Sequence, residues 1–379
     1  MSENSILYNM QRQFGENITQ RYPLFLGERM GLHDVVDTTY PEIEKLVLLQ
    51  RSQFWTETEV DLSKDVQQWD SLSTNEQDVS ILNLAWQSQA DTIAGRAPLL
   101  ALLPLVTNPE MEELVNWWQT FEQIHTRSYQ HIIRTVFPDP ERVRDSVAMN
   151  EKAQKRLGIL ADCFEELHYI SAQFTLDSYD GNPYKTYSKK AVQLAIIRAL
   201  ASLYALESIQ FFCSFACTFA LAELGIMTGI SDILRLIAKD EALHTRFTHA
   251  IISILRKDPE WADLVEQVLQ NEFHAIMGAV EDLEADWADY LFSEGRSILG
   301  LNAESLKDYG AYLRGGAVRA LGLPPIEGRP IVDRNPLPWI NQYLDPSMIQ
   351  VAPQERDVTN YRVGSVDGNV GDLEEFDDL

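Results

Sequence analysis

The chain has 379 residues, of which 45% are hydrophobic, and it carries a formal net charge of −26. This length and composition indicate an ordinary globular protein with a substantial core. The excess of acids argues against binding to the phosphate backbone of nucleic acid or to an anionic membrane surface, because both need a basic face. We therefore expect neither nucleic acid nor a membrane among the partners of this protein.

Three further features predict a cytoplasmic location. The N-terminal sequence MSENSILYNM lacks the basic and apolar segments of a signal peptide. The three cysteines fit neither a metal-finger spacing nor a secreted disulfide framework, so free thiols are expected. The most apolar run, 199–227, is interrupted by Glu207 and Glu223, which favours a buried helix over a membrane span.

Helical periodicity dominates residues 65–315, where apolar residues recur at steps of three and four, and strand signals are scarce. The pattern predicts an all-α domain over 51–345, preceded by an N-terminal arm over 1–50. The expected helices, in chain order, are one ending at 94–98, one over 109–137, one over about 190–224, one from Ser231 or Asp232 to about 256, and others near 259–292 and 303–321.

Local signals set several of these boundaries. Gly95 and Pro98 are expected to interrupt the first helix, and Asn108 and Pro109 are a good N-cap and first-turn pair for the second. That helix should end before Pro138. The segment DGNPYKTYSKK, 180–190, is expected to form a loop or a short hairpin.

The last segment, 346–379, differs in composition from the rest. It has eight acidic residues against two basic ones and few large apolar side chains, so a flexible tail is expected. Leu373, Phe376 and Leu379 stand among the acids at its end. A tail that is only solvated needs no such anchors, which suggests that this end docks to a partner.

The residues that carry chemistry begin in the helix over 109–137. Its inward face contains Glu122, His125 and Tyr129, at offsets of three and four along the chain. A buried carboxylate and imidazole are costly unless they are paired or bind a metal. The helix that ends near 256 repeats the pattern with Glu241 and His244, an i,i+3 pair whose side chains can reach one ion.

One Glu-x-x-His pair is more often a salt-bridged or surface pair than a metal site, but each pair here follows a carboxylate on the preceding helix. Asp91 lies 31 residues before Glu122, and Glu207 lies 34 residues before Glu241. This repeated order predicts a four-helix bundle that supplies four carboxylates and two imidazoles to two metal ions. Hard oxygen ligands with one histidine per ion suit iron(II) or manganese(II) better than zinc or calcium.

Apolar and aromatic residues surround the predicted centre. Phe211 and Phe215 follow Glu207 by four and eight residues, and Ile237 precedes Glu241 by four, so all three are expected to line the pocket around the metals. Their alternative role is simple core packing. Tyr129 could likewise be an ordinary buried tyrosine, but beside an oxygen-activating metal pair it is a natural donor of one electron and one proton.

At this point the chain resembles the small (β) subunit of class I ribonucleotide reductase, over nearly its whole length. The segments that carry the resemblance are FWTETEVDLSKD (54–65), DTIAGRAPLLALLPL (91–105), EQIHTRSYQHIIR (122–134), ALESIQFFCSFACTFA (205–220), RLIAKDEALH (235–244), DWADYLF (286–292), NPLPWINQYL (335–344) and VAPQERDVTNYRVG (351–364). The resemblance implies a ferritin-like four-helix bundle with additional helices, assembled as a homodimer.

The resemblance also implies a role for each residue of the centre. The ligands of an oxo-bridged di-iron centre, formed with oxygen, would be Asp91, Glu122, His125, Glu207, Glu241 and His244. Tyr129 would hold a stable tyrosyl radical. Trp55 and Asp240 would relay an electron and a proton between the metals, through His125, and the subunit surface.

The tail would complete the transfer to a second protein. Tyr361 would pass the oxidising equivalent to the large subunit, where a ribonucleotide is reduced, and Glu355 would assist proton movement at the interface. The peptide that ends in Phe376 and Leu379 would dock into that large subunit. Trp55 also has an ordinary alternative as a packing residue, and Asp240 as a surface acid.

Two other functions remain open from the residues. A ferritin-like iron-storage protein would explain the six ligands but not Trp55, Tyr129 and Tyr361. A di-metal oxidase would explain oxygen activation but not the docking-like tail. The residues do not decide between iron and manganese, because both metals accept these ligands.

Overall fold

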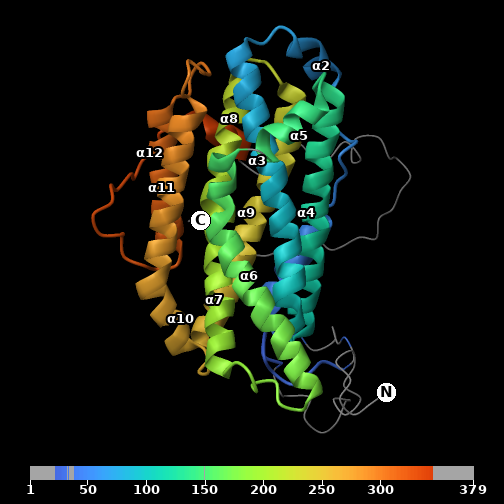
Figure 1. Ribbon diagram of the computed structural model, residues 1–379, viewed down its shortest axis with the longest axis vertical. Coiled ribbons are helices and arrows are strands. Elements are labelled where there is room, and N and C mark those ends of the chain that lie inside the picture. The colour runs from blue at the N-terminus through green and yellow to red at the C-terminus, as the bar shows by residue number, and fades with distance from the viewer. Residues whose placement is uncertain (1–21, 32, 34–37, 149, 345–379) are drawn as a thin grey trace.

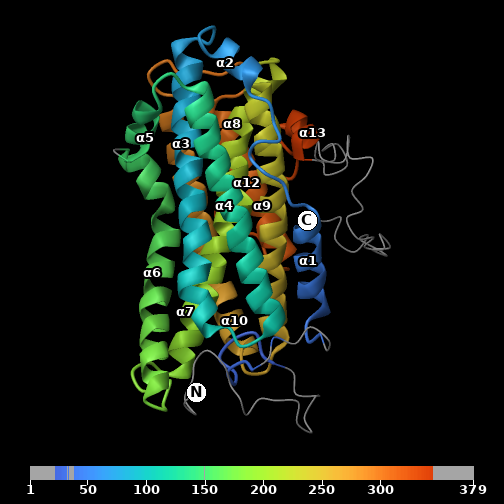
Figure 2. The ribbon, with the colours of Figure 1, turned by 90° about the vertical axis from the view of Figure 1, so that its right-hand side faces the viewer.

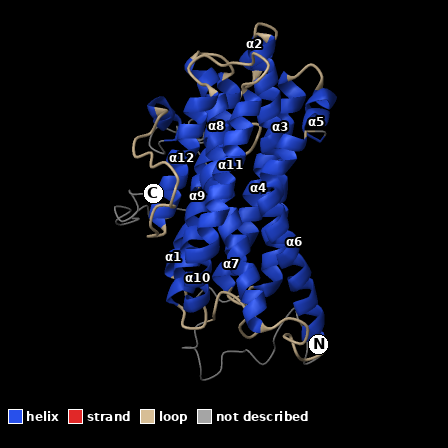
Figure 3. Ribbon diagram, turned by 60° about the vertical axis from the view of Figure 1, so that its left-hand side comes forward, coloured by secondary structure: helices blue, strands red, loops and turns tan. Residues whose placement is uncertain are grey.

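The computed structural model describes residues 22–31, 33, 38–148 and 150–344 (Figure 1). Within this part of the chain the regular elements are helices, as Figure 3 shows. Extended pairing there is limited to two isolated bridges, Phe25 with Val106 and Ile298 with Leu301. The predicted all-α fold is confirmed.

The helices follow one another along the chain with short connections. They are α1 (Pro41–Ser52), α2 (Ser63–Trp69), α3 (Thr74–Ala97), α4 (Pro109–Val136), α5 (Pro140–Ala148), α6 (Glu151–Tyr179), α7 (Lys189–Ala205), α8 (Phe211–Glu223), α9 (Thr228–Lys257), α10 (Ala262–Val268), α11 (His274–Leu291), α12 (Ala303–Ala320) and α13 (Asn341–Leu344). Three π-helical segments, η1 (Pro98–Leu102), η3 (Leu206–Gln210) and η4 (Leu269–Phe273), and two 3₁₀ segments, η2 (Leu103–Leu105) and η5 (Pro338–Ile340), complete the set.

Four long elements form the central bundle: α3, α4, the continuous run α7–η3–α8, and α9. Neighbouring members pack along much of their length, α3 on α4 and α8 on α9 (Figures 1 and 2). Helix α6 packs on α7, and the hairpin of α11 and α12 packs on η3 and α8. Helix α1 lies on the opposite flank, against α4 and α9 (Figure 2). The bundle interior is therefore covered on both sides.

Most predicted helices are confirmed. Helix α4 begins at Pro109, and the Asn108 side chain accepts a hydrogen bond from the Met111 N–H at 2.8 Å. The most apolar run belongs to Lys189–Glu223, of which the most apolar window is 83% buried, so it is a core helix of the bundle. The segment between α6 and α7 is a loop without strands. Helix α1 crosses residue 50, where we expected the N-terminal arm to end.

Gly95 does not interrupt the first long helix, contrary to the prediction. Helix α3 continues through it to Ala97, and the chain changes to a π-helical turn at Pro98. A Cβ on Gly95 would lie 2.9 Å from the Cβ of Glu122, closer than packed carbons approach. The glycine therefore serves a close approach of α3 and α4 at Glu122, and not a break in the helix.

The fourth bundle helix begins at Thr228, three residues before the earlier of the two predicted starts. Its free N–H groups are capped from elsewhere in the chain. The carboxylate of Asp65, in α2, accepts hydrogen bonds from the N–H groups of Gly229 and Ile230 at 3.1 Å each. A cap supplied from such a distance in sequence leaves no local signal, which explains the error.

Candidate metal centre

The six predicted ligands come together in the middle of the bundle. Each of the four bundle elements contributes at least one of them, and all six side chains are at most 1% exposed. They form two overlapping groups, and within each group the ligand atoms lie within 4.8 Å of one another. The first group is Asp91, Glu122, His125 and Glu241, and the second is Glu122, Glu207, Glu241 and His244.

The two groups share Glu122 and Glu241, so these carboxylates lie between the two histidines. The Nδ1 atom of His125 is 3.0 Å from an oxygen of Glu241, and the Nδ1 atom of His244 is 3.1 Å from oxygens of both Glu122 and Glu241. The imidazole centroids are 5.7 Å apart. Both rings therefore turn the same nitrogen towards a shared set of oxygens.

These residues fit a pair of divalent metal ions. Both oxygens of Asp91 and of Glu207, and one oxygen each of Glu122 and Glu241, are buried and accept no hydrogen bond from the described residues. Buried carboxylate oxygens without donors are costly. Four carboxylates carry the charge that two divalent ions would neutralise, and oxygen ligands with one imidazole per ion suit iron or manganese.

Three acids of the cluster, Asp91, Glu207 and Glu241, have shifted pKa values in the metal-free protein. Burial, followed by the charges of neighbouring carboxylates, raises the pKa of Asp91 and of Glu207 well above the usual range. Burial acts in the same direction on Glu241, but His244 and His125 outweigh it and lower the pKa of that carboxyl.

The two histidines of the cluster also have shifted pKa values. Burial opposes their charged forms, but contacts with carboxylates outweigh it and raise the pKa of both His125 and His244 well above the usual value. Metal binding to these histidines must therefore displace protons.

A π-helical turn places Glu207. The segment η3 inserts between α7 and α8, and Glu207 is its second residue. Such insertions are frequent at functional sites, because an extra residue per turn re-aims a side chain without ending the helix. The periodicity of the sequence predicted one continuous helix here, since a single extra residue barely changes the pattern of apolar residues.

A hydrogen-bonded chain leaves the cluster from the outer nitrogen of His125. The Nε2 atom of His125 is 3.0 Å from Oδ2 of Asp240, and the indole N–H of Trp55 donates to the same oxygen at 2.7 Å. All three side chains are buried. The amide of Gln50 donates to the other oxygen of Asp240 at 3.2 Å.

Two residues around the cluster were not predicted. Gln50, in α1, holds Asp240 as described above, and the indole N–H of Trp118 donates to Glu122 at 3.1 Å. Trp118 stands on the same helical face as Glu122, four residues before it, so its spacing could have revealed it. Gln50 had no such signal, because it falls in a segment that we expected to be an arm.

Tyr129 lies one turn after His125 and is fully buried. Its hydroxyl has no hydrogen-bond partner among the described residues. Burial, with the charges of Asp91 and Glu241, raises its pKa well above the usual value. The phenol is therefore held as a neutral group, away from water and next to the acids of the cluster.

The three predicted pocket residues are all fully buried. Phe211 stacks on Phe215 with ring centroids 5.9 Å apart, and it also meets Trp86 at 5.8 Å. Ile237 is in α9, one turn before Glu241. Burial is consistent with either role, so their place around the radical site stays a prediction. The predicted tail residues, Glu355, Tyr361, Leu373, Phe376 and Leu379, lie outside the described residues.

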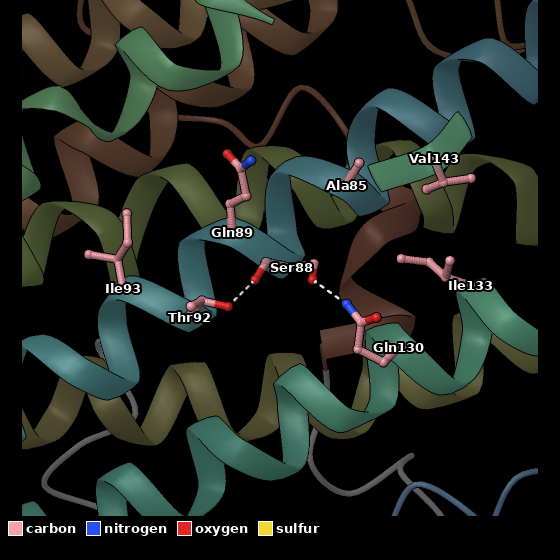
Figure 4. A pocket seen from close by; sticks show the side chains of 8 residues that line it. All are labelled: Ala85, Ser88, Gln89, Thr92, Ile93, Gln130, Ile133 and Val143. Atoms are coloured by element: carbon pink, nitrogen blue, oxygen red, sulfur yellow. Dashed lines mark hydrogen bonds between the residues drawn. The ribbon is translucent and has the colours of Figure 1, made fainter. Parts of the chain in front are cut away.

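A surface pocket of about 310 Å³ lies between α3, α4 and α5 and shares no residue with the cluster (Figure 4). Inside it, the amide of Gln130 donates to the hydroxyl of Ser88 at 3.2 Å. Its lining is Ala85, Ser88, Gln89, Thr92, Ile93, Gln130, Ile133 and Val143. The candidate centre is therefore a site within the packed core, separate from this hollow.

The bundle and its cluster define a di-metal carboxylate protein of the ferritin-like type. A family model described as ribonucleotide reductase, small chain, matches residues 33–336. The chain belongs to the ribonucleotide reductase small-chain family.

Individual relatives agree with this assignment. The chain is 38% identical to ribonucleoside-diphosphate reductase subunit beta of Haemophilus influenzae over 374 residues, which is 96% of this chain and 97% of that protein. It is also 38% identical to ribonucleoside-diphosphate reductase 1 subunit beta of Escherichia coli O157:H7, over 95% of this chain and 97% of that protein.

Among solved structures, the fold is similar to the ribonucleotide reductase R2 subunit from Clostridium botulinum, with a TM-score of 0.73 and 23% identity. That match covers 88% of this chain and 97% of the other. A dimanganese(II) NrdF protein of Streptococcus sanguinis matches with a TM-score of 0.64 and 18% identity, over 84% of this chain and 100% of the other.

Proposed function

We propose that this chain is the radical-generating small subunit of a ribonucleoside-diphosphate reductase and works with a large subunit in making deoxyribonucleotides. The observation that carries the proposal is the buried set of four carboxylates and two imidazoles, with a buried tyrosine one turn away. Family membership supplies the reaction class, since curated relatives of nearly equal length are beta subunits of this reductase.

Two metal ions would be held by Asp91, Glu122, His125, Glu207, Glu241 and His244. When bound, they supply reaction with oxygen and one-electron oxidation. Iron is our first choice and manganese is the second. Manganese is included because a protein of the same fold is described as dimanganese. The part of this chain is to hold the ions out of water between carboxylates that would otherwise repel one another.

Tyr129 would hold the oxidising equivalent as a radical after losing one electron and one proton. Its burial protects a radical from solvent reductants, and the neighbouring carboxylate of Asp91 would accept the phenol proton when the ring is oxidised. Phe211, Phe215 and Ile237 would form the apolar surroundings that slow quenching. A storage protein needs none of these features.

The chain from Trp55 through Asp240 to His125 would relay an electron and a proton towards the large subunit. Asp240 is placed to accept the indole proton of Trp55 at 2.7 Å when that ring gives up an electron. Tyr361 and Glu355 would continue the transfer, and Leu373, Phe376 and Leu379 would dock the tail. A homodimer and a cytoplasmic location complete the proposal.

The test is electron paramagnetic resonance after iron(II) and oxygen are added to metal-free protein. We expect a tyrosyl signal in the wild type and none in Tyr129→Phe, with equal iron bound by both. Accumulation of ferric mineral without a radical in the wild type would instead support a storage protein, and would reject the proposal.

A further inference from the structure

A second cluster of buried polar and aromatic groups lies on the α6 and α11 side of the bundle. The guanidinium carbon of Arg156 is 3.5 Å from the ring centroid of Trp86 and 4.7 Å from that of Trp287. Arg156, Trp86 and Trp287 are at most 2% exposed. One buried cation therefore contacts two buried indoles.

Among the residues that the structure describes, the charge of Arg156 has one carboxylate partner. Glu284 accepts hydrogen bonds from its Nε and Nη2 atoms at 2.9 and 2.8 Å, which is the in-plane, two-pronged arrangement typical of this pair. The carboxylate thus meets the edge of the guanidinium, and the indoles lie over the group. The negative charge of Glu284 weakens the electric field of the guanidinium at the indole rings. The carboxylate itself does not lie between the rings and the guanidinium.

This cluster begins beside the candidate metal centre. Trp86 is five residues before Asp91 on α3, a rise of roughly 7.5 Å. The amide of Gln210, the last residue of the π-helical turn that carries Glu207, donates to Glu284 at 3.2 Å and to the carbonyl of Arg156 at 2.9 Å. Trp86 is thus within electron-transfer reach of an oxidant in the centre.

The cluster also leads away from the centre. The ring of Trp287 is 5.5 Å from that of Tyr290, a partly exposed residue of α11. The guanidinium carbon of Arg296 lies 5.1 Å over the Tyr290 ring. Three oxidisable rings therefore run from the neighbourhood of Asp91 towards the surface, and each has a guanidinium against it.

A cation against an indole opposes oxidation of that indole. Removing one electron makes the ring a radical cation, which the adjacent guanidinium repels instead of attracting it as it does the neutral ring. The alternative product, a neutral radical, requires an acceptor for the indole proton. The N–H groups of Trp86 and Trp287 have no hydrogen-bond partner among the described residues.

We propose that Arg156 confines oxidation to the Tyr129 side of the centre by making Trp86 and Trp287 hard to oxidise. The inference rests on the radical function proposed above. The reaction that Arg156 suppresses is the return of one electron and one proton from Trp86 to the Tyr129 radical. That reaction would restore the phenol and move the oxidising equivalent to an indolyl radical at Trp86, so that Tyr129 would no longer store it.

The test compares wild type with the double variant Arg156→Met/Glu284→Gln, which removes the cation without leaving a buried carboxylate unpaired. Metal-free protein is treated with iron(II) and oxygen, and oxidation at Trp86 and Trp287 is measured by peptide mass spectrometry. We expect oxidation of these residues to increase about tenfold, and the radical lifetime to fall by a similar factor. Adding Trp86→Phe to the double variant should restore the lifetime.

The single variant Glu284→Gln provides a control of opposite sign. It removes the carboxylate charge and keeps the guanidinium, so Trp86 should become harder to oxidise than in the wild type. This is measured on metal-free protein with a photo-generated one-electron oxidant, which needs neither bound iron nor a working Tyr129. In the same assay the double variant should give more oxidised Trp86 than the wild type.

The two assays separate this proposal from the one on which it rests. Equal tryptophan oxidation in wild type, Glu284→Gln and the double variant with the photo-generated oxidant would overturn the role of Arg156, whatever the iron experiment gives. The expected order in that assay, with no tyrosyl radical in iron-loaded wild type, would keep the role of Arg156 as a barrier and reject the radical function.

Discussion

Two of the tryptophans around the candidate centre, Trp55 and Trp86, have polar neighbours of opposite charge. The indole of Trp55 donates its N–H to the carboxylate of Asp240, whereas the face of Trp86 carries the guanidinium of Arg156. Both rings are buried. A carboxylate stabilises an oxidised indole and can accept its proton, and a guanidinium does neither.

Buried indoles on two sides of the bundle therefore have different electrostatic surroundings. On the side of α1 and α9, a continuous set of hydrogen bonds joins His125 to Trp55. On the side of α6 and α11, each ring of the aromatic row has a guanidinium against it. Under the proposed function, charge placement would therefore separate an open route from a closed one.

The largest expected effect is on stability, from breaking the buried pair on the closed side. Arg156→Met leaves Glu284 buried with Gln210 as its remaining donor in the described part of the chain, so the free energy of unfolding should fall by about 3–5 kcal/mol. Chemical denaturation of metal-free protein measures this change. The double variant with Glu284→Gln should recover most of it. An equal loss in both variants would mean that Arg156 stabilises chiefly by packing between the indoles.

Asp240→Asn should have a large effect on the open side. The amide cannot take the proton of Trp55 or hold an imidazolium at His125, so ribonucleotide reduction with the large subunit should fall by about 100-fold. Iron content and initial radical yield should change far less. Loss of iron instead would show that Asp240 serves metal binding and not transfer.

A matched pair of substitutions compares the two sides directly. Trp55→Phe should abolish nucleotide reduction because phenylalanine is not oxidised under these conditions, and Trp86→Phe should leave it close to the wild-type value. Turnover with the large subunit measures both variants, and the radical signal of each is the control. If Trp86→Phe lost turnover with its radical intact, the assignment of open and closed sides would be reversed.

The open side could be predicted from sequence, and the closed side could not. Glu-x-x-His pairs and their upstream acids predicted the six residues of the buried cluster, since a short spacing on a helix fixes which side chains share a face. Trp55 and Asp240 came from family resemblance, because 185 residues separate them. Arg156, Trp86 and Trp287 come from three helices with no shared spacing, so only the packing of α3, α6 and α11 brings them together. The π-helical turn at Glu207 was not predicted either, because one extra residue leaves the apolar pattern nearly unchanged.

Gln210 connects the closed side to the metal ligands, and its replacement should have a smaller effect. Gln210→Leu removes the hydrogen bonds from the π-helical turn to Glu284 and Arg156, so Glu207 should be held less firmly and metal affinity should fall about tenfold. Equilibrium titration with manganese(II) measures this affinity. Gln87→Leu is the matched control, because the buried Gln87 amide makes no hydrogen bond with the described residues. Equal affinities in the two variants would contradict the positioning role.

The smallest expected effect is a pH dependence that distinguishes the two sides. Four groups have raised pKa values in the folded, metal-free protein, so folding takes up protons on them. They are Asp91, Glu207, His125 and His244. Their contribution to stability is therefore present at low pH and is lost as pH rises through the folded-state pKa values, which for the two histidines lie well above the usual 6.5. Metal binding must displace the same protons, so the increase in melting temperature on adding manganese(II) should be larger at about pH 8 than at about pH 6.

Hydrogen bonding to Asp240 is the strongest of the interactions that raise the pKa of His125 against burial, so Asp240→Asn should weaken this pH dependence. Glu284→Gln should not, because its carboxylate acts on the closed side and not on the ligands. A change of equal size in both variants would mean that the two sides of the centre are electrostatically coupled, and that the open and closed routes are not independent.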